Sequence, residues 1–411
     1  MKKTIHLLLI SILLTSCDHF GSTRVKNLID MTKKLEVESN EKIAFKDLKK
    51  SPFSGEKIKS HSISKSKIIG QPAMAKGVFY SVDTKGNLTA FSSKEKKILW
   101  STNIAKNSTD RGFTSGGILF SDKTLYVTYG SRNLVIVDAN NGVELIRKEF
   151  PDILRSKPVL ADDRILLVQT ISNQLVAYDT KSSKFLWINE GGLETISSAN
   201  QISPVLYNDN VLVSYSSGEV ALIDIKSGKE KWIINITSLG EVGTPSLEAA
   251  TITTQPIVIG SNAFFATSNG KLFKTNLNDG SIVWQKDAED IQTISVYGDN
   301  LLLTNNARQL AIVSTNNGKV KWVGNLISVK ERSTKKPKAV LFQTPFVSQV
   351  DNKISVFVLA SNGELYQFTQ DTNGNLPQQP DIIKTTPGAH YQWLSCCSGK
   401  LHIFTDNKVF Y

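Results

Sequence analysis

The sequence predicts an all-β protein, an eight-bladed β-propeller of four-stranded antiparallel blades, and three observations lead to this prediction. The stretch from Ile202 to Ile234 contains four short apolar runs, at 202–206, 211–215, 219–224 and up to Trp232, separated by Asn-Asp and Ser-Gly turns. The third run is apolar on both faces, as in a strand whose sheet packs between two other sheets. The unit also recurs along the chain, so copies of it can cover both faces.

The recurring unit ends in the same residue type almost every time. Its final positions are Trp100, Ile146, Trp187, Trp232, Trp284 and Trp322. Their spacing, roughly 43 residues with four strands per unit, is typical of a β-propeller. The chain has six Trp residues and five of them occupy this position, which indicates a shared structural role. We expect each Trp to pack between neighbouring blades with its indole N–H bonded to the backbone; stacking on a ligand is the alternative.

The blades follow one another without a second domain between them. The expected ranges of the first seven are 68–103, 112–150, 156–190, 201–236, 254–287, 290–325 and 340–386. The eighth has strands near 390–395, 400–405 and 408–411, and is one strand short. A closed ring leaves no unpaired edge between its first and last blades. We therefore expect residues near 56–65 to form the outermost strand of blade eight, so that the propeller spans 56–411.

The N-terminus has the pattern of an export signal. In residues 1–16, Lys2 and Lys3 precede a short apolar stretch. The sequence from Leu14 to Cys17 resembles the bacterial lipobox, in which the Cys becomes the lipidated first residue of the mature protein. We expect lipidation at Cys17 and a lipid-anchored tether over 17–55; a plain signal peptide with a chance Cys is the alternative. Asp18 follows, and an Asp there tends to hold enteric lipoproteins in the inner membrane.

The positive charge is concentrated in the expected tether. The formal net charge is +11, and residues 24–67 hold 12 basic and 6 acidic side chains, a difference of +6. We expect this segment to be solvated; attraction to an anionic membrane surface is the alternative. No basic stripe interleaved with aromatic residues accompanies the charge, so nucleic-acid binding is not expected.

Few residues are candidates for catalysis or metal binding. Asp138, Asp179 and Asp224 end third strands, where we expect them to close turns by accepting backbone N–H groups; metal ligation is the alternative. His61, His390 and His402 are too scattered for a metal or general-base cluster. Cys396 and Cys397 are either two buried thiols or a vicinal disulfide. No catalytic motif is present, so we expect no catalytic residue, metal site or cofactor.

The unit SPVLYNDNVLVSYSSGEVALIDIKSGKEKW resembles the propeller repeat named after pyrroloquinoline quinone. With the lipobox and the short tether, the chain is similar to the BamB family, lipoprotein subunits of the machine that folds β-barrels into the bacterial outer membrane. The resemblance implies anchoring in the outer membrane, facing the periplasm. It implies docking on the periplasmic domains of the central subunit BamA, with unfolded outer-membrane proteins as a further candidate ligand.

The family's contact face is built by loops after the third and fourth blade Trp residues. The corresponding positions here are Glu194, Ile196 and Ser197 in the first loop and Thr251 and Thr253 in the second, and only Ile196 keeps the chemistry of the family's motif. The two loops, 190–201 and 236–254, are also more apolar than surface loops need to be. We expect one partner-binding patch that includes Leu193, Ile196, Leu239, Val242 and Leu247.

Two other functional classes share the fold. A quinone-dependent dehydrogenase would need calcium-binding carboxylates, a catalytic Asp and a vicinal Cys pair beside the cofactor. Here the Cys pair lies in the last blade, and no acidic cluster converges with it. An inner-membrane scaffold or sensor is favoured only by Asp18.

Overall fold

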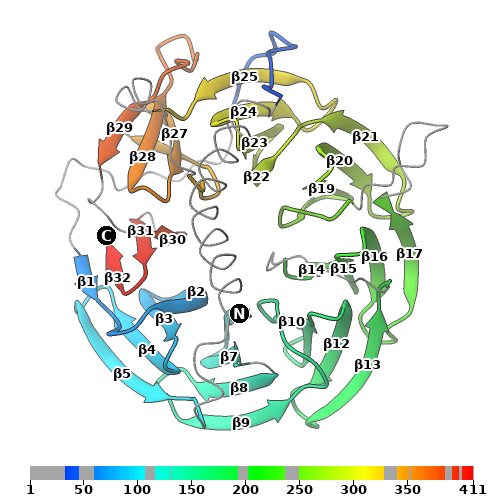
Figure 1. Cartoon of the computed structure of the whole chain (residues 1–411), viewed down its shortest axis with the longest axis vertical. Helices are drawn as coiled ribbons and strands as arrows, with labels where there is room; N and C mark the ends of the chain where they lie inside the picture. Colours follow the sequence, from blue (N-terminus) through cyan, green and yellow to red (C-terminus); the bar gives the residue numbers. More distant parts are fainter. Residues whose placement is uncertain are drawn as a thin grey trace, which may run out of the picture.

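The computed structural model describes residues 33–45, 60–106, 116–130, 132–192, 202–236, 250–327, 340–350, 353–384, 391–397 and 400–410. Within these ranges the chain forms 32 β-strands joined by turns, and no α-helix. No helix in this part of the chain could therefore cross a membrane. The sheets stand around a central axis, with the first strand of a sheet inward and the last at the rim (Figure 1). This is the arrangement of a β-propeller.

The strands group into sheets of four in chain order, which we number as sheets. Sheet 1 is β2 (Ile68–Ala75), β3 (Val78–Asp83), β4 (Asn87–Ser92) and β5 (Lys97–Asn103). Sheet 2 is β6 (Gly117–Ser121), β7 (Thr124–Tyr129), β8 (Asn133–Asp138) and β9 (Glu144–Glu149). A single parallel bridge between Gln71 and Gly117 links sheets 1 and 2.

The middle of the ring follows the same order. Sheet 3 is β10 (Val159–Ala161), β11 (Ile165–Gln169), β12 (Gln174–Asp179) and β13 (Lys184–Glu190). Sheet 4 is β14 (Val205–Tyr207), β15 (Asn210–Ser214), β16 (Glu219–Asp224) and β17 (Glu230–Asn235). Sheet 5 is β18 (Ile257–Ile259), β19 (Asn262–Ala266), β20 (Lys271–Asn276) and β21 (Ile282–Asp287).

Sheet 6 is β22 (Ile291–Tyr297), β23 (Asn300–Asn305), β24 (Gln309–Ser314) and β25 (Val320–Asn325). Sheet 7 is β26 (Phe346–Val350), β27 (Lys353–Leu359), β28 (Glu364–Thr369) and β29 (Asp381–Lys384). Sheet 8 joins the two ends of the chain in the order β1-β32-β31-β30. Its strands are β30 (Tyr391–Cys397), β31 (Lys400–Thr405), β32 (Lys408–Phe410) and β1 (Ser60–Ser62).

The N-terminal strand β1 is the outer strand of sheet 8. Ser60, His61 and Ser62 pair antiparallel with Phe410, Val409 and Lys408. After β1 the chain buries Ile63, which is 1% exposed, in a cluster with Ile68 and Val409. A strand from the N-terminal part of the chain and the last described strand therefore meet in one sheet and one apolar cluster. Cys396 and Cys397 lie on β30, but their side chains are outside the described part of the structure.

The repeat unit has the strands that the sequence predicts, with one shifted boundary. On β16, Val220, Ala221, Leu222 and Ile223 are all at most 3% exposed, so both faces of the third strand are buried as predicted. The fourth strand does not end in Trp232 but continues to Asn235. A bulge beside Ile223 shifts the register, and pairing then runs on to Glu219 and Asn235. Trp232 therefore lies inside the strand, and its side chain reaches the next sheet.

Each repeated Trp joins its sheet to the following one. The indole Nε1 of each donates to one backbone carbonyl of the next sheet: Trp100 to Ala139 (3.0 Å), Trp187 to Ile225 (2.9 Å), Trp232 to Leu277 (2.8 Å), Trp284 to Thr315 (3.2 Å) and Trp322 to Leu376 (3.0 Å). The predicted packing role of the Trp is confirmed. An indole N–H that finds a backbone acceptor can be buried at little cost, because its hydrogen bond is kept.

A glycine lies beneath four of these indole rings. Gly142, Gly228, Gly280 and Gly318 each have a positive φ, and a Cβ there would come within 2.5–3.0 Å of the Trp from the preceding sheet. The corresponding turn positions of sheets 1 and 3 hold Lys96 and Ser183, also at positive φ. Sheet 2, which precedes sheet 3, has Ile146 in place of the Trp. Glycine thus occurs where the indole ring needs the space.

We expect Gly228→Ala to lower the free energy of unfolding by about 2–5 kcal/mol. The left-handed backbone at φ +71 disfavours a side chain by about 1–2 kcal/mol, and the Cβ would lie 2.6 Å from the ring of Trp187, which adds the cost of overpacking, about 1–3 kcal/mol. Gly260→Ala is the matched control, since Gly260 has φ +55 and no atom within 4 Å of the added Cβ. Equal losses for both variants in denaturant titrations would show that the Trp contact contributes nothing.

The Asp residues at the ends of third strands close turns, as predicted. Oδ1 of Asp138 accepts the amide of Asn140 at 2.8 Å, and Oδ1 of Asp224 accepts that of Ser227 at 2.8 Å. Asp179 accepts the amides of two following residues and the guanidinium of Arg164, and this ion pair holds the pKa of Asp179 below its usual range. These carboxylates are occupied within their turns, and within the described ranges no cluster of three metal-ligating side chains occurs.

Residues 33–45 depart from the expectation for the tether. They do not extend into solvent but lie along sheet 6, at the rim beside β24 and β25 (Figure 1). Leu35 is 9% exposed and packs with residues of sheets 5 and 6. Most of these residues are exposed, as expected of a solvated segment, but the segment is docked on the propeller, which the sequence did not predict.

A candidate partner-binding face

The two long loops that the sequence singles out leave from one side of the ring. On this side the chain passes from the rim strand of one sheet to the inner strand of the next, as from β13 to β14 and from β17 to β18. Because strands alternate in direction, the turns between second and third strands lie on the same side. We call it the loop-bearing face. The turns between first and second strands and between third and fourth strands lie on the opposite face.

Both loops are rooted in a single apolar seam. The described chain stops at Gly192 and resumes at Ile202 around the first loop, and stops at Ile236 and resumes at Ala250 around the second. Ile202, Ile236, Ala250 and Ile252 are each at most 7% exposed and belong to one hydrophobic cluster between sheets 4 and 5. The end of the first loop and both ends of the second are therefore fixed next to each other.

A side-chain amide ties the two roots together. The amide of Ser203 donates to Oε1 of Gln255 at 2.9 Å, and Nε2 of Gln255 donates back to the carbonyl of Ser203 at 2.8 Å. The side chain of Gln255 thus bonds both the N–H and the C=O of Ser203. This two-point contact fixes the return of the first loop against the return of the second.

The entry to the first loop is held by polar groups of sheets 3 and 4. The amide of Gly192 donates to Oε2 of Glu219 at 2.5 Å, and its carbonyl accepts from Nδ2 of Asn173 at 3.0 Å. The Oδ1 of Asn173 accepts from the amide of Ser216 at 3.0 Å. A Cβ on Gly191 would come within 2.4 Å of the Tyr215 ring, so only glycine fits this close approach.

Tyr215 supports this entry from below. It is 1% exposed, and its hydroxyl donates to Oδ1 of Asn189. Burial raises the pKa of Tyr215, and the carboxylates of Glu230 and Glu219 add to the rise. The hydroxyl therefore remains a neutral donor over the physiological range, which suits a positioning role and not proton transfer.

The residues predicted to bind a partner fall into two groups. Leu193, Glu194, Ile196, Ser197 and Leu247 lie outside the described residues, as do Leu239, Val242 and the lipidation candidate Cys17. Thr251 and Thr253 are described and half-buried. The amide of Thr251 donates to Oγ of Ser268 at 2.9 Å, and both the amide and the hydroxyl of Thr253 donate to the carbonyl of Ala266. Thr253 is thus engaged within sheet 5.

Two isoleucines on this face were not predicted from the sequence. Ile153 and Ile171 are both 39% exposed, and the amide of Ile171 donates to the carbonyl of Ile153 at 2.8 Å. Two residues further on, Asn173 holds the entry to the first loop. Isolated exposed isoleucines are common on protein surfaces. Here they are neighbours beside the loop root, and they extend the apolar patch expected of the loops towards sheet 3.

Comparison with known proteins agrees with this architecture. The profile of the protein family described as "Outer membrane protein assembly factor BamB" matches residues 84–324, more than half of the chain. The chain belongs to the BamB family. Its relatives in that family include BamB of Yersinia pestis, 22% identical over 337 residues that cover 78% of this chain and 80% of the relative. An uncharacterized protein of Rickettsia prowazekii is 39% identical over 416 residues, which cover all of this chain and 99% of the relative.

A solved structure of the family has the same fold. The crystal structure of BamB from Moraxella catarrhalis superimposes with a TM-score of 0.65 at 14% identity, over 86% of this chain and 96% of that one. A computationally designed protein, Ika8, matches almost as well, with a TM-score of 0.61 at 11% identity. The fold alone therefore does not indicate a function; the family and the loop-bearing face do.

Proposed function

We propose that this BamB-family protein is a non-catalytic scaffold of the outer-membrane barrel-assembly machinery. It is anchored through a lipid on Cys17 and faces the periplasm. Its propeller is a ring of eight blades that β1 closes through sheet 8. The loop-bearing face docks on the periplasmic domains of the central BamA-type subunit, through loops 190–201 and 236–254, and in this way assists the folding and insertion of outer-membrane proteins.

One observation carries the docking proposal: both loops are rooted in one buried cluster between sheets 4 and 5. Their apolar residues, Leu193 and Ile196 in one and Leu247 in the other, are then presented side by side from a rigid base. A buried apolar centre with a polar rim is the usual form of a protein–protein interface. The exposed Ile153 and Ile171 fit at its margin.

We expect the double substitution Leu193→Asp and Ile196→Asp to weaken binding to the isolated periplasmic domains of the central subunit. Loss of an anchor residue at such a patch costs about 1–3 kcal/mol, or roughly 5- to 150-fold in affinity. The matched control is Leu206→Asp with Ile259→Asp, which changes two aliphatic residues of sheets 4 and 5 on the opposite face, 37% and 41% exposed. Equal affinities for the two double variants, measured by calorimetry, would refute the proposed face.

Two alternatives lead to different observations. A quinone-dependent dehydrogenase would oxidise alcohols or sugars when supplied with its cofactor and calcium, and such activity in the purified protein would refute the scaffold role. An inner-membrane scaffold, which Asp18 favours, would sediment with inner-membrane vesicles in a density gradient and would not co-purify with the central subunit. Membership of the BamB family supports anchoring in the outer membrane over anchoring in the inner membrane.

A further inference from the structure

The segment 33–45, which we call the strap, is bound to sheets 5 and 6 along its length. Near the start of the strap, the side chain of Gln309 forms two hydrogen bonds with the backbone of Leu35. The N–H of Leu35 donates to Oε1 of Gln309 at 2.9 Å, and Nε2 of Gln309 donates to the carbonyl of Leu35 at 3.1 Å. Gln309 is 5% exposed and Leu35 is 9% exposed. Just before it, the amide of Lys33 donates to Oε2 of Glu289 at 2.9 Å. The first part of the strap therefore has a specific, buried attachment.

The middle of the strap binds the rim strand β25 and its neighbour β21. The amides of Glu38 and Ser39 donate to the carbonyl of Val320, and Val320 N donates back to Oε2 of Glu38 at 3.1 Å. The other carboxylate oxygen of Glu38 accepts from Nζ of Lys286 at 2.5 Å. One glutamate thus connects the strap to two adjacent sheets.

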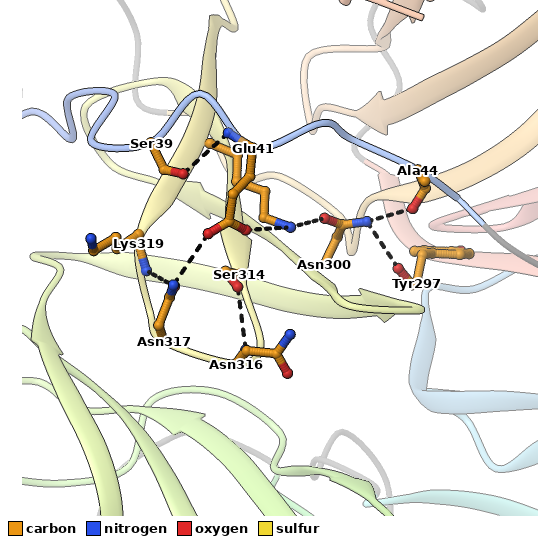
Figure 2. A network of polar contacts seen from close by, with 10 residues as sticks. Ser39, Glu41, Ala44, Tyr297, Asn300, Ser314, Asn316, Asn317 and Lys319 are labelled. Carbon is orange, nitrogen blue, oxygen red and sulfur yellow. Dashed lines mark hydrogen bonds and ion pairs between the residues drawn. The ribbon is translucent and has the colours of Figure 1, made fainter.

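The last part of the strap forms the network in Figure 2. Glu41 accepts from Nδ2 of Asn317 at 3.2 Å and forms an ion pair with Lys321 at 3.3 Å. The Nζ of Lys321 also donates to Oδ1 of Asn300 at 3.1 Å, and Nδ2 of Asn300 donates to the carbonyl of Ala44 at 2.8 Å. Asn300 therefore links the buried lysine to the end of the strap.

Sheet 6 is adapted to the strap at one position. The residue before the rim Trp is Leu99 in sheet 1, Leu186 in sheet 3 and Val283 in sheet 5, all 41–49% exposed. In sheet 6 it is Lys321, whose side chain is 6% exposed and paired with Glu41. Sheet 4 also has a lysine there, Lys231, but its side chain is 53% exposed. A lysine is buried at the rim only where the strap supplies a carboxylate, because burial without a partner would be costly.

The strap also changes the side of the ring on which the chain leaves. Lys33 lies at Glu289, in the connection from β21 to β22 on the loop-bearing face. Ala44 lies at Asn300, beside the turn from β22 to β23 on the opposite face. The strap therefore crosses the rim from one face to the other. With the strap docked, the chain towards residue 17 departs from the loop-bearing face; without it, the chain would depart from β1.

We propose that the docked strap holds the loop-bearing face of the propeller towards the lipid surface in which the chain is anchored. This inference rests on the proposed lipid anchor at Cys17. Fifteen residues, 18–32, separate that Cys from Lys33, and they span at most roughly 50 Å. From β1 the separation is 42 residues, 18–59, or at most roughly 150 Å. A short tether from one face raises the effective concentration of that face's loops at a membrane-bound partner.

The orientation can be measured by energy transfer from a dye on the protein to acceptor-labelled lipid headgroups. Ser172→Cys and Lys181→Cys place the dye just before and just after β12, on the loop-bearing and the opposite face respectively. Both are made in the lipidated chain with Cys396→Ser and Cys397→Ser, reconstituted in vesicles of phosphatidylethanolamine and phosphatidylglycerol. We expect higher transfer from the label at position 172. Equal transfer, or higher transfer from position 181, in a chain that is attached to the vesicles overturns the inference.

The strap itself is tested by a matched pair of variants. Leu35→Asp places a charge at a residue that is 9% exposed, and Val37→Asp places the same charge two residues on, at a residue that is 50% exposed. We expect Leu35→Asp to speed trypsin cleavage after Lys42 and to abolish the difference between the two labels, while Val37→Asp changes neither. If Leu35→Asp leaves the strap docked, the double variant Glu38→Lys with Glu41→Lys is used instead to release the strap.

A released strap that leaves the label difference unchanged overturns the proposal. A chain that is not recovered with membranes at all refutes the anchor of the proposed function, and with it this inference. The two failures are distinguishable because the second is seen before any label is read. In either case, cleavage after Lys42 in the soluble Cys17→Ser chain reports strap docking without a membrane.

Strap docking is also expected to weaken in acid. Burial alone would raise the pKa of Glu38, but its bonds to Lys286 and Val320 outweigh this and lower it. The bonds to Asn317 and Lys321 lower the pKa of Glu41. Carboxylates whose pKa is lowered on docking favour the docked state above their free pKa, and this contribution is lost as the pH falls below it.

Hydrogen-exchange mass spectrometry of peptides from the strap, corrected for intrinsic rates, checks this expectation. Protection of the amide of Leu35 is expected to fall between neutral pH and about pH 4, where free glutamate becomes protonated. Peptides from β16 serve as the internal control, since this strand is buried on both faces. Strap protection that does not change relative to β16 would mean that the carboxylates do not contribute to docking.

Discussion

Replacing Cys17 with Ser is expected to release the protein from the membrane as a soluble exported chain. The thioether-linked and amide-linked acyl chains that the lipobox resemblance implies would each contribute about 0.8 kcal/mol per buried methylene, so several chains make a stable anchor. Without them only the tether's positive charge attracts the chain to lipid, and this attraction is screened by salt. Fractionation after a carbonate wash measures the loss, and we expect nearly all of the Cys17→Ser protein in the supernatant.

The matched control for this experiment is Cys396→Ser. It removes a thiol from β30 and leaves the lipobox intact, so the protein should remain in the pellet. If Cys17→Ser also stays in the pellet after the wash, the anchor is not a lipid on Cys17. Retention that disappears in high salt would instead assign the attachment to the basic residues of the tether.

A chain that begins at Ile69 is expected to be less stable than the full chain by at least about 4 kcal/mol. It lacks β1, and with it Ile63 and Ile68, which are 1% and 0% exposed in the cluster that also holds Val409. Removing a buried isoleucine side chain typically costs about 2–5 kcal/mol. The deletion also leaves the edge of β32 unpaired. Such a loss is a large part of the 5–15 kcal/mol that stabilises a typical domain.

A chain that begins at Ser60 separates this effect from that of the strap. It lacks residues 33–45 but keeps β1, Ile63 and Ile68. We expect it to lose less stability than the chain that begins at Ile69, because it keeps β1 and its cluster, and both truncated chains can be compared by urea titration. If the two unfold at the same urea concentration, pairing of β1 with β32 does not stabilise the ring, and the proposal that β1 closes it fails.

The repeat could be predicted from the sequence because its signals are local. Strand 219–224 is apolar at every inner position, and turns of Asn, Asp, Ser and Gly bound it. The role of Trp232 was also predictable, since a bulky residue that recurs once per unit must have a recurring partner. What the sequence missed was the end of that strand, at Asn235. A bulge allows the pairing to continue past the Trp, and bulges leave no clear mark in residue composition.

The strap could not be predicted, because its contacts are not local. Leu35 and Gln309 are 274 residues apart, and Asn300 and Ala44 are 256 apart. The strap's own sequence, LEVESNE, has neither the apolar run of a buried strand nor a turn signal. The clearest sign was Lys321, which stands where sheets 1, 3 and 5 have an aliphatic residue. A lysine at that position looks like an ordinary surface residue until its 6% exposure is known.

The candidate face was predictable only in part, because some of its residues are brought together only by the fold. Loop length and apolar content pointed to residues 190–201 and 236–254, and the cluster shared by Ile202 after the first loop and by Ile236 and Ala250 around the second supports their grouping. Ile153 and Ile171 were missed because each is a single apolar residue in a short polar segment. Only the ring brings Ile171 beside Ile153 and places both near Gly192.

The joint between a Trp and the next sheet has a consequence for how such a ring grows. Sheets 4, 5 and 6 each carry both halves of the joint: a Trp on the rim strand, and a glycine turn that receives the Trp of the preceding sheet. A duplicated gene segment that encodes one such sheet would therefore supply both a Trp and a glycine turn. The added sheet could form the joint on both sides when it is inserted between two sheets that already share one. Where Ile146 precedes Ser183, neither half is present, so a duplicated segment of this kind would not form the joint at that seam.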